Sequence, residues 1–313
     1  MAKVLGFLKG KKAEISVRFE SDTEREMKRV GESEVPIFVG SEDVSGRASV
    51  ITKKSMSHLG IKAEFIGQIE LSHARGKPVV FVQEVLDLAG EGSMEGSSVF
   101  DFAFEGVEKI HESYNGINAR LRYFVRITVG QKYGDIVKES DIWVINYSSA
   151  PEDNRGIKME VGISECLHIE IEYVSTKHNL QDVVIGKIYF LLSRIKVKHM
   201  AVSLVRRETV AVGKEHVSER RILSKYEIMD GEPVRGESIP VRIFLGAYPL
   251  TPTYHKVENK FSLRYYLSLG IIDAEDRRYF KQHEIVLWRR TEEADEDRRA
   301  LGAFRSALSK TKS

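Results

Sequence analysis

Apolar and polar residues alternate one by one along several segments of this chain, a pattern typical of β-strands with one face in a core and one in water. The first such segment places Ala13, Ile15, Val17 and Phe19 at every second position. Three more segments of the first half show the same period, with apolar residues spread over 61–71, 100–104 and 117–127. Residues 81–88 fit either a strand or one face of a helix. The alternation predicts an all-β fold.

The second half of the chain repeats the order of patterns found in the first half. Residues 167–173 alternate as residues 13–19 do. Four later segments follow in the same order as their counterparts: 182–188 after 43–48, 239–244 after 99–104, 263–267 after 121–125, and 285–288 after 142–144. A repeat of this length indicates a duplicated domain, because solenoid repeats are only about 20–50 residues long.

The length of the chain also favours two domains, because 313 residues exceed the roughly 250 at which a single core stops growing. Each copy has several short strands separated by turn signals, which is typical of an antiparallel β-sandwich. Turn-forming residues concentrate in 146–156 and interrupt the alternation. We therefore predict two β-sandwich domains, 1–150 and 151–290, joined by a short linker.

A charged tail follows the second predicted domain. Residues 291–313 carry mixed charge and few apolar side chains, among them Leu301, Phe304 and Leu308. Their spacing of three and four fits a weak amphipathic helix. A solvated tail that frays fits the same composition.

The charge balance argues against nucleic acid as a ligand. The chain has 48 Lys and Arg against 46 Asp and Glu, a net charge of +2, whereas duplex binding needs a concentrated basic excess. The single cysteine, Cys166, allows no intramolecular disulfide and no thiolate zinc site, which fits a reducing compartment. We expect Cys166 to be a buried structural thiol.

Membrane contact is expected to be peripheral only. No apolar run approaches the roughly 18–20 residues of a membrane span. Four lysines, Lys3, Lys9, Lys11 and Lys12, surround the apolar residues 4–8. This end of the chain is either a weak contact with an anionic membrane surface or an edge strand with solvated lysines.

Signatures of catalysis are scarce. No pair of histidines stands at metal-binding spacing with a carboxylate, and no Gly-x-Ser-x-Gly motif is present. His168 lies on the polar side of its alternating segment, so it reads as an exposed strand residue. We predict a protein that is not an enzyme and has no cofactor and no metal.

Two adjacent apolar residues break the alternation in the second half. Ile228 and Met229 stand directly before Asp230 and Gly231. Both side chains of such a pair cannot face the core of a half-buried sheet, and the Asp-Gly turn signal places them near an exposed tip. The pair is therefore either an exposed contact for a partner or the end of a fully buried strand.

A family resemblance is carried by four long runs of sequence. They read KMEVGISECLHIEIEY (158–173), IGKIYFLLSRIKVKHM (185–200), YEIMDGEPVRGESIPVRIFL (226–245) and FSLRYYLSLGIIDAEDRRYFKQHEIVLW (261–288). These runs resemble the arrestin-like subunit of retromer, the vacuolar protein sorting 26 family. The resemblance covers most of the chain and implies two tandem β-sandwich domains of arrestin-like type with a role that needs no catalysis.

The resemblance also implies a place of action and a set of partners. Proteins of that family act on the cytosolic face of endosomes, in a coat that retrieves transmembrane cargo toward the Golgi or the plasma membrane. The implied partners are the helical-solenoid subunit of the vacuolar protein sorting 35 family, sorting nexins, and the cytosolic tails of cargo.

Two candidate sites follow from the resemblance. The contact with the solenoid subunit falls on Tyr226, Ile228, Met229 and Asp230. The pocket for cargo and sorting nexin falls on Val161 and Phe280. Near this pocket the chain departs from the family pattern, with Ser164 and Glu165 where two acids are expected and His283 where glutamine is expected.

Other functions were weighed against this one. An arrestin-like trafficking adaptor outside retromer is the first alternative, although an adaptor for ubiquitin ligases would carry proline-tyrosine motifs, and residues 289–313 contain none. A β-sandwich lectin or small-ligand carrier would be expected to show a secretory signal or a cluster of aromatic and acidic residues for its ligand. Neither is visible in the sequence.

Overall fold

The computed structural model describes residues 13–20, 25–72, 77–163 and 166–290. It divides the chain into two compact units, Met1–Asn146 and Tyr147–Ser313. This division falls at the start of the segment 146–156 in which the linker is predicted. The finer assignment of domains to 1–150 and 151–290 stays a prediction.

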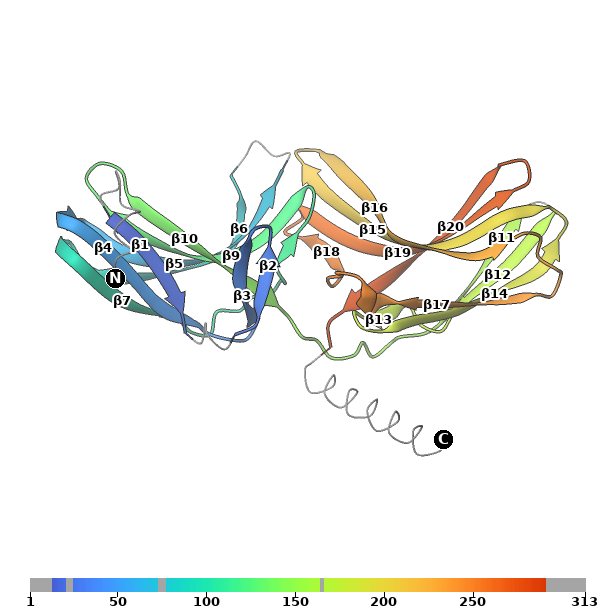
Figure 1. Ribbon diagram of the computed structural model, residues 1–313, viewed down its shortest axis with the longest axis horizontal. Coiled ribbons are helices and arrows are strands. Elements are labelled where there is room, and N and C mark those ends of the chain that lie inside the picture. The colour runs from blue at the N-terminus through green and yellow to red at the C-terminus, as the bar shows by residue number, and fades with distance from the viewer. Residues whose placement is uncertain (1–12, 21–24, 73–76, 164–165, 291–313) are drawn as a thin grey trace, which may run out of the picture. The chain divides into compact units, whose positions relative to one another are not determined.

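Unit 1 is a sandwich of two sheets (Figure 1). The smaller sheet has the order β1-β4-β7, from Ala13–Phe19, Val44–His58 and Gly92–Phe104. The larger sheet has the order β2-β3-β10-β9-β5-β6, from Met27–Val30, Ser33–Val39, Ile136–Ile145, Ala119–Gly130, Gly60–Leu71 and Val79–Ala89, with β8 (Tyr114–Asn115) beside β9. All pairs are antiparallel except β3 with β10.

Unit 2 is built in the same way. Its smaller sheet has the order β11-β12-β14-β17, from Ile157–Ile163, Leu167–Tyr173, Val183–Ser193 and Ser238–Phe244. Its larger sheet has the order β13-β20-β19-β15-β16, from Lys177–Asn179, Arg278–Trp288, Phe261–Asp273, Val197–Val212 and Glu215–Asp230, with β18 (Tyr254–Val257) beside β19. Among the described residues the only helical piece is the short 3-10 helix η1, Leu245–Ala247.

The strand pairings show the duplication directly. In unit 1 the order β10-β9-β5-β6 has its counterpart in β20-β19-β15-β16 of unit 2, and β4-β7 corresponds to β14-β17. The one parallel pair of each unit, β3 with β10 and β13 with β20, takes the same place. The predicted all-β fold of two antiparallel sandwiches is therefore confirmed.

Aromatic side chains join the two sheets of unit 1. In unit 1 the ring of Phe19 in β1 meets Phe38 in β3 edge-on, with centroids 5.7 Å apart. Phe65 in β5 lies 5.8 Å from Phe104 in β7. Such edge-on and tilted contacts suit the charge distribution of aromatic rings and add to the area they bury. The predicted apolar faces of these strands therefore make the core.

One prediction about water-facing residues is wrong in the middle of unit 1. On the side of β5 away from the core, Glu64, Ile66 and Gln68 are all buried. The neighbouring strand β9 covers this side with Arg122, whose guanidinium lies 4.1 Å from the centroid of Phe124 and bonds Glu139 and Asp141. A paired arginine shields apolar surface with its stem, so both faces of the sheet are covered here.

Three smaller predictions are settled by the structure. Residues 81–88 belong to strand β6, so the helical alternative is wrong. Ile117 lies before β9 and is exposed, because the strand begins only at Ala119. Cys166 is exposed, so its prediction as a buried thiol is wrong, since it stands in the turn between β11 and β12. The tail 291–313 and the lysines of residues 1–12 lie outside the described residues.

Lys109 is a buried cation that ties loops of unit 1 together. Its side chain is 1% exposed, and its Nζ donates to the carbonyl oxygens of Gly40 (3.3 Å), Val107 (3.1 Å) and Glu42. Burial lowers the pKa of Lys109, while the charges of Asp43 and Glu42 oppose that shift. The three carbonyls replace the water that the ammonium loses.

Candidate protein-interaction sites

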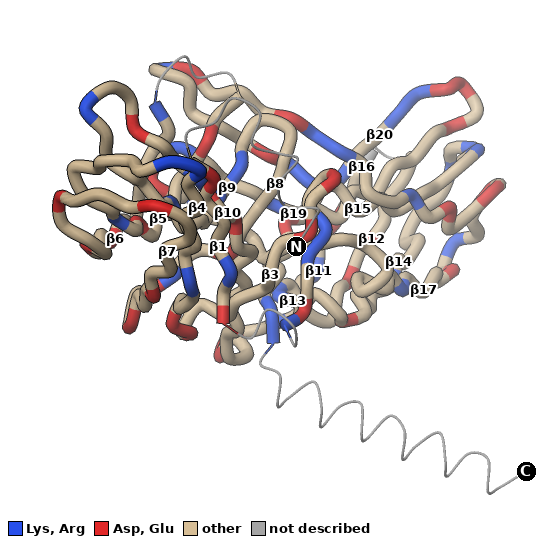
Figure 2. Tube along the Cα trace, turned by 60° about the vertical axis from the view of Figure 1, so that its left-hand side comes forward, with Lys and Arg blue, Asp and Glu red and all other residues tan. Residues whose placement is uncertain are grey.

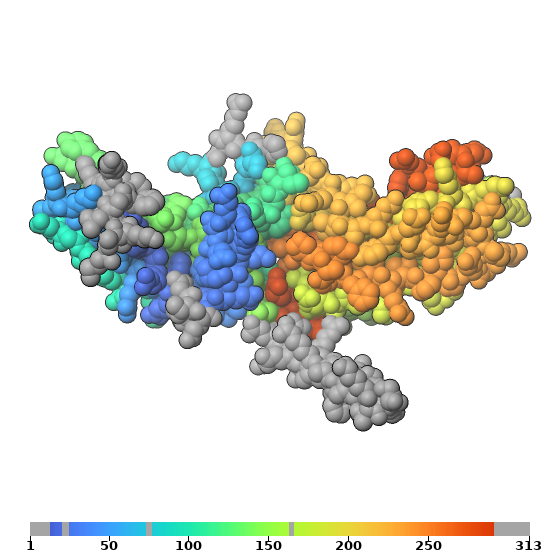
Figure 3. Space-filling model, in the orientation of Figure 1, coloured from blue at the N-terminus to red at the C-terminus, as the bar shows by residue number. Residues whose placement is uncertain are grey.

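The predicted contact for the solenoid subunit lies at the end of a long edge strand. β16 pairs with β15 on one side, and it is the last strand in its sheet among the described residues. The β15–β16 hairpin forms part of the surface of unit 2 (Figure 3, gold). An edge strand offers unpaired main-chain groups and side chains to a partner.

A β-bulge explains the adjacent apolar pair in β16. Met229 pairs with Met200 and Glu227 pairs with Ala201, so Ile228 is the extra residue between two successive pairs. A bulge of this kind releases the alternation locally. Both Ile228 and Met229 are half-buried, which lies between the two alternatives left open by the sequence.

The residues on either side of the pair fix the end of the strand. The hydroxyl of Tyr226 is hydrogen-bonded to the hydroxyl of Tyr248 from the segment after η1. Burial, and then this hydrogen bond, raise the pKa of Tyr226. Asp230 is exposed and ends β16, and Gly231 follows with φ of +117°, a conformation that favours glycine. The structure therefore brings Tyr226, Ile228, Met229 and Asp230 together on one strand end.

Two polar contacts lie near this apolar pair. His199 Nδ1 lies 2.9 Å from Glu227 Oε1. Lys198 Nζ lies 2.9 Å from Asp276 Oδ1, and both side chains are well exposed. Exposed ion pairs contribute little to stability and exchange partners easily. An apolar centre with a polar rim is the usual anatomy of a protein-binding patch.

The second predicted site has its two residues on different sheets. Val161 lies in β11, opposite the fully buried Ile169, so it faces the core from an edge strand and is half-buried. Phe280 lies in β20 opposite Gly270 and is 64% exposed. The residues beside Gly270 in β19 are buried, so Phe280 points away from the core.

A hydrogen-bonded turn positions Phe280. The carboxylate of Asp273 at the end of β19 accepts hydrogen bonds from Arg277 Nε (2.7 Å), from the Arg277 backbone (2.9 Å) and from the Tyr279 hydroxyl (3.1 Å). Desolvation raises the pKa of Asp273, but the hydrogen bonds from these donors lower it by more, so the pKa lies below its ordinary value. These hydrogen bonds fix the turn between β19 and β20 as far as Tyr279, the residue before Phe280.

Val161 and Phe280 lie on different sheets of unit 2, and their shared pocket stays a prediction. Ser164 and Glu165 lie outside the described residues. His283 is half-buried in β20, and its ring is stacked on Tyr173 of β12 with centroids 6.3 Å apart. Burial lowers the pKa of His283. At the position where glutamine is expected, this chain therefore has a histidine ring that packs between the two sheets of unit 2.

His168 lies on the polar side of its strand, as its place in the alternation predicts. His168 is half-exposed on β12, with Nε2 3.1 Å from Glu160 Oε2. Acidic and basic residues are interspersed over both units in Figure 2. Within the described part of the chain, no three His, Cys, Asp or Glu residues gather closely enough to hold a metal ion. In the same part, no helix is both long and apolar enough to cross a membrane.

Comparison with known proteins gives a consistent result. The family model described as "Vacuolar protein sorting-associated protein 26" matches residues 9–276. A protein of that name from Dictyostelium discoideum is 54% identical over 81% of this chain and 74% of its own length. "Vacuolar protein sorting-associated protein 26B" from Homo sapiens is 54% identical over 81% of this chain and 76% of its own length.

The two duplicated sandwiches define an arrestin-like β-protein whose candidate sites are strand ends and edges. This class of fold agrees with the family found by comparison. The chain belongs to the vacuolar protein sorting-associated protein 26 family, as the resemblance predicted.

Proposed function

We propose that this chain is the arrestin-like subunit of retromer, a coat that sorts transmembrane cargo at the cytosolic face of endosomes. In this role it is not an enzyme. It binds the solenoid subunit of the vacuolar protein sorting 35 family and, together with sorting nexins, selects cargo for retrieval to the Golgi or the plasma membrane. Family membership supports the sorting role, and the surface of unit 2 supports the mode of binding.

The observation that carries the proposal is the half-buried pair Ile228 and Met229 on the β16 bulge. Full burial of one such side chain contributes roughly 1.5–3 kcal/mol to the free energy of binding. A groove of the solenoid subunit that covers both side chains would bury the part of each that is still exposed. The polar contacts of His199 and Lys198 would be the rim around such an anchor.

Cargo is proposed to bind as an added strand. β11 is the edge strand of the smaller sheet of unit 2, with β12 on one side and no strand on the other among the described residues. An extended cargo tail would pair with this free edge and place an apolar side chain near Val161, with Phe280 and the sorting nexin as further walls.

Calorimetric titration of the purified chain with the purified solenoid subunit tests the proposal. We expect a saturable one-to-one complex that forms without cargo, sorting nexin or membrane. Absence of binding, with both proteins folded by their melting curves, would overturn the assignment to retromer and favour an adaptor outside it.

A further inference from the structure

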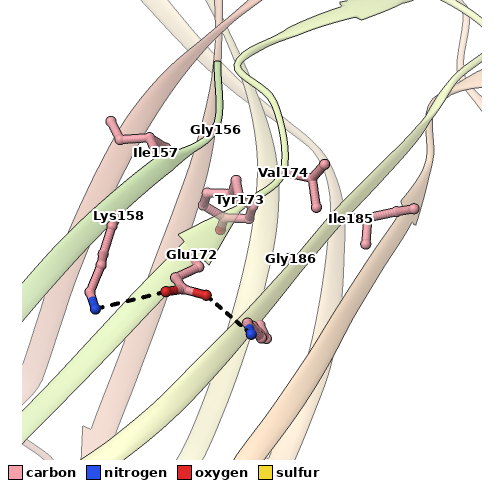
Figure 4. A pocket seen from close by; sticks show the side chains of 9 residues that line it. Gly156, Ile157, Lys158, Glu172, Tyr173, Val174, Ile185 and Gly186 are labelled. Carbon is pink, nitrogen blue, oxygen red and sulfur yellow. Dashed lines mark ion pairs between the residues drawn. The ribbon is translucent and has the colours of Figure 1, made fainter. Parts of the chain in front are cut away.

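A hollow of about 320 Å³ opens on the smaller sheet of unit 2 and is lined by residues of β11, β12 and β14 (Figure 4). Gly156 leaves space beside the exposed Val174 on the outer face, whereas Gly186 pairs with the buried Tyr173 and faces the core. A Cβ at Gly186 would lie 2.6 Å from the backbone carbonyl oxygen of Glu172. A Cβ at Gly156 would lie 2.7 Å from the backbone carbonyl oxygen of Tyr173.

The hollow has apolar walls that are open to solvent. Val174 is 67% exposed and Ile185 is 48% exposed. Phe244, which is 59% exposed, continues this apolar surface, because it pairs with Val183 two residues before Ile185 in β14. Three large apolar side chains thus lie uncovered at one end of the sheet.

Basic side chains stand at the rim of the hollow, and the lysines among them are paired with carboxylates. Lys158 and Lys187 share the carboxylate of Glu172, at 3.8 Å and 3.2 Å, as the dashed lines in Figure 4 show. Lys158 also bonds Glu170, and Arg242 pairs with Ile185 in the next strand. Exposed ion pairs such as these contribute little to stability, so the lysines can accept another carboxylate at little cost.

The tail of the chain leaves the described structure close to this hollow. Arg290, the last described residue, contacts the carboxylate of Asp182 at 3.5 Å. Asp182 directly precedes β14, and Ile185 is three residues further along, about 10 Å away at the rise of a strand. Leu301 is eleven residues beyond Arg290, which spans about 16 Å as a helix and about 36 Å when extended.

The composition of the tail complements the hollow. Its first part carries five acidic residues within 292–297, and its second part carries Leu301, Phe304 and Leu308 at helical spacing. We propose that the tail docks on its own unit 2, with the acidic run against Lys187 and Arg242 and the apolar stripe over Val174, Ile185 and Phe244. A short tether raises the effective concentration to the millimolar range, so a weak contact is enough to occupy the hollow.

Disulfide trapping in the full chain tests the proposal. All variants carry Cys166→Ser, so that only introduced thiols react. One variant adds Val174→Cys with Phe304→Cys, and its matched control adds Ser218→Cys, on the exposed surface of β16, with the same Phe304→Cys. Intact mass and thiol counting at low protein concentration give the rate of intramolecular closure. We expect the first pair to close roughly tenfold faster than the control at low salt.

Charge reversal separates docking from chance encounters. Lys187→Glu with Arg242→Glu should slow closure of the first pair by roughly fivefold, and adding Glu292→Lys with Glu293→Lys should restore it. Reversal of the exposed Lys214 and Lys256 to Glu is the matched control and should leave the rate unchanged. Equal closure of both cysteine pairs, or failure of the restoring variant in a chain that melts normally, would overturn the proposal.

Discussion

At the scale of single residues, we expect stability to depend on a few buried polar groups. Lys109 is buried with three carbonyl oxygens around its ammonium. His283 lies half-buried against Tyr173, and its Nε2 is buried without a hydrogen-bond partner among the described residues. Neither role could be predicted from the sequence, because the partners come from distant segments of the chain.

Replacement of Lys109 should destabilise unit 1 strongly. Lys109→Met keeps the aliphatic stem but removes the ammonium donor from the carbonyl oxygens of Val107 and Glu42, while Gly40 keeps the backbone N–H of Lys109; each unsatisfied buried group costs roughly 1–3 kcal/mol. Urea unfolding should therefore show a large loss for Lys109→Met. The matched control is Lys138→Met at an exposed lysine of β10, which should change stability by less than about 0.5 kcal/mol. Equal effects of the two variants would contradict the buried role.

His283 should make stability depend on pH. Burial lowers its pKa in the folded chain below the ordinary value of 6.5, so the unfolded chain binds the proton first as the pH falls. Stability is then full above about pH 6.5 and is lost as the pH falls toward the lower folded pKa. Desolvation also lowers the pKa of His178, which adds to the same loss.

Melting curves between about pH 7.5 and 5 test this assignment. His283→Gln should make the fall in melting temperature shallower, because one of the two buried imidazoles is gone. His255→Gln, at an exposed histidine of β18, is the control and should keep the slope of the parent chain. If His283→Gln kept the pH dependence of the melting temperature seen in the parent chain, the imidazole of His283 would be hydrated in solution and not buried.

At the scale of elements, the informative features are strand edges and the irregularities that they carry. β16 ends in a bulge that half-exposes two large apolar residues, and β11 leaves one edge open. The sequence showed that Ile228 and Met229 could not both obey the alternation. It could not show the bulge, because a bulge depends on the register of two strands and is not a property of one strand.

The proposed cargo site leads to a prediction at this scale. Val161→Asp and Phe280→Asp should each weaken binding of a cargo peptide in the presence of the sorting nexin by at least about tenfold, because a charge in an apolar wall excludes the apolar anchor. Binding of the solenoid subunit should persist. Leu191→Asp, at an exposed position of β14, is the control. Cargo affinity within about twofold of the parent for both variants would place the site elsewhere.

At the scale of the whole molecule, the duplication is the property that the sequence predicted best. The repeated order of alternating segments corresponds to strands in matching places of two sandwiches, for example β4 and β14. The sequence pattern did not predict that both faces of β5 are covered, or that Cys166 is exposed, because both depend on tertiary contacts. The candidate contacts with partners came from the family resemblance, because the periodicity of a sequence carries no information about the shape of a partner.

The central claim is that the end of β16 is the anchor for the solenoid subunit. It is tested most directly by measuring both the melting temperature and the solenoid affinity of Ile228→Ser/Met229→Ser, with Ile222→Ser on the same strand as control. Because both side chains are already half-buried, we predict a loss of binding of roughly 1.5–3 kcal/mol, about ten- to a hundredfold, with only a small fall in melting temperature. A clearly lower melting temperature with binding retained would show that the pair belongs to the core of unit 2 and not to an interface.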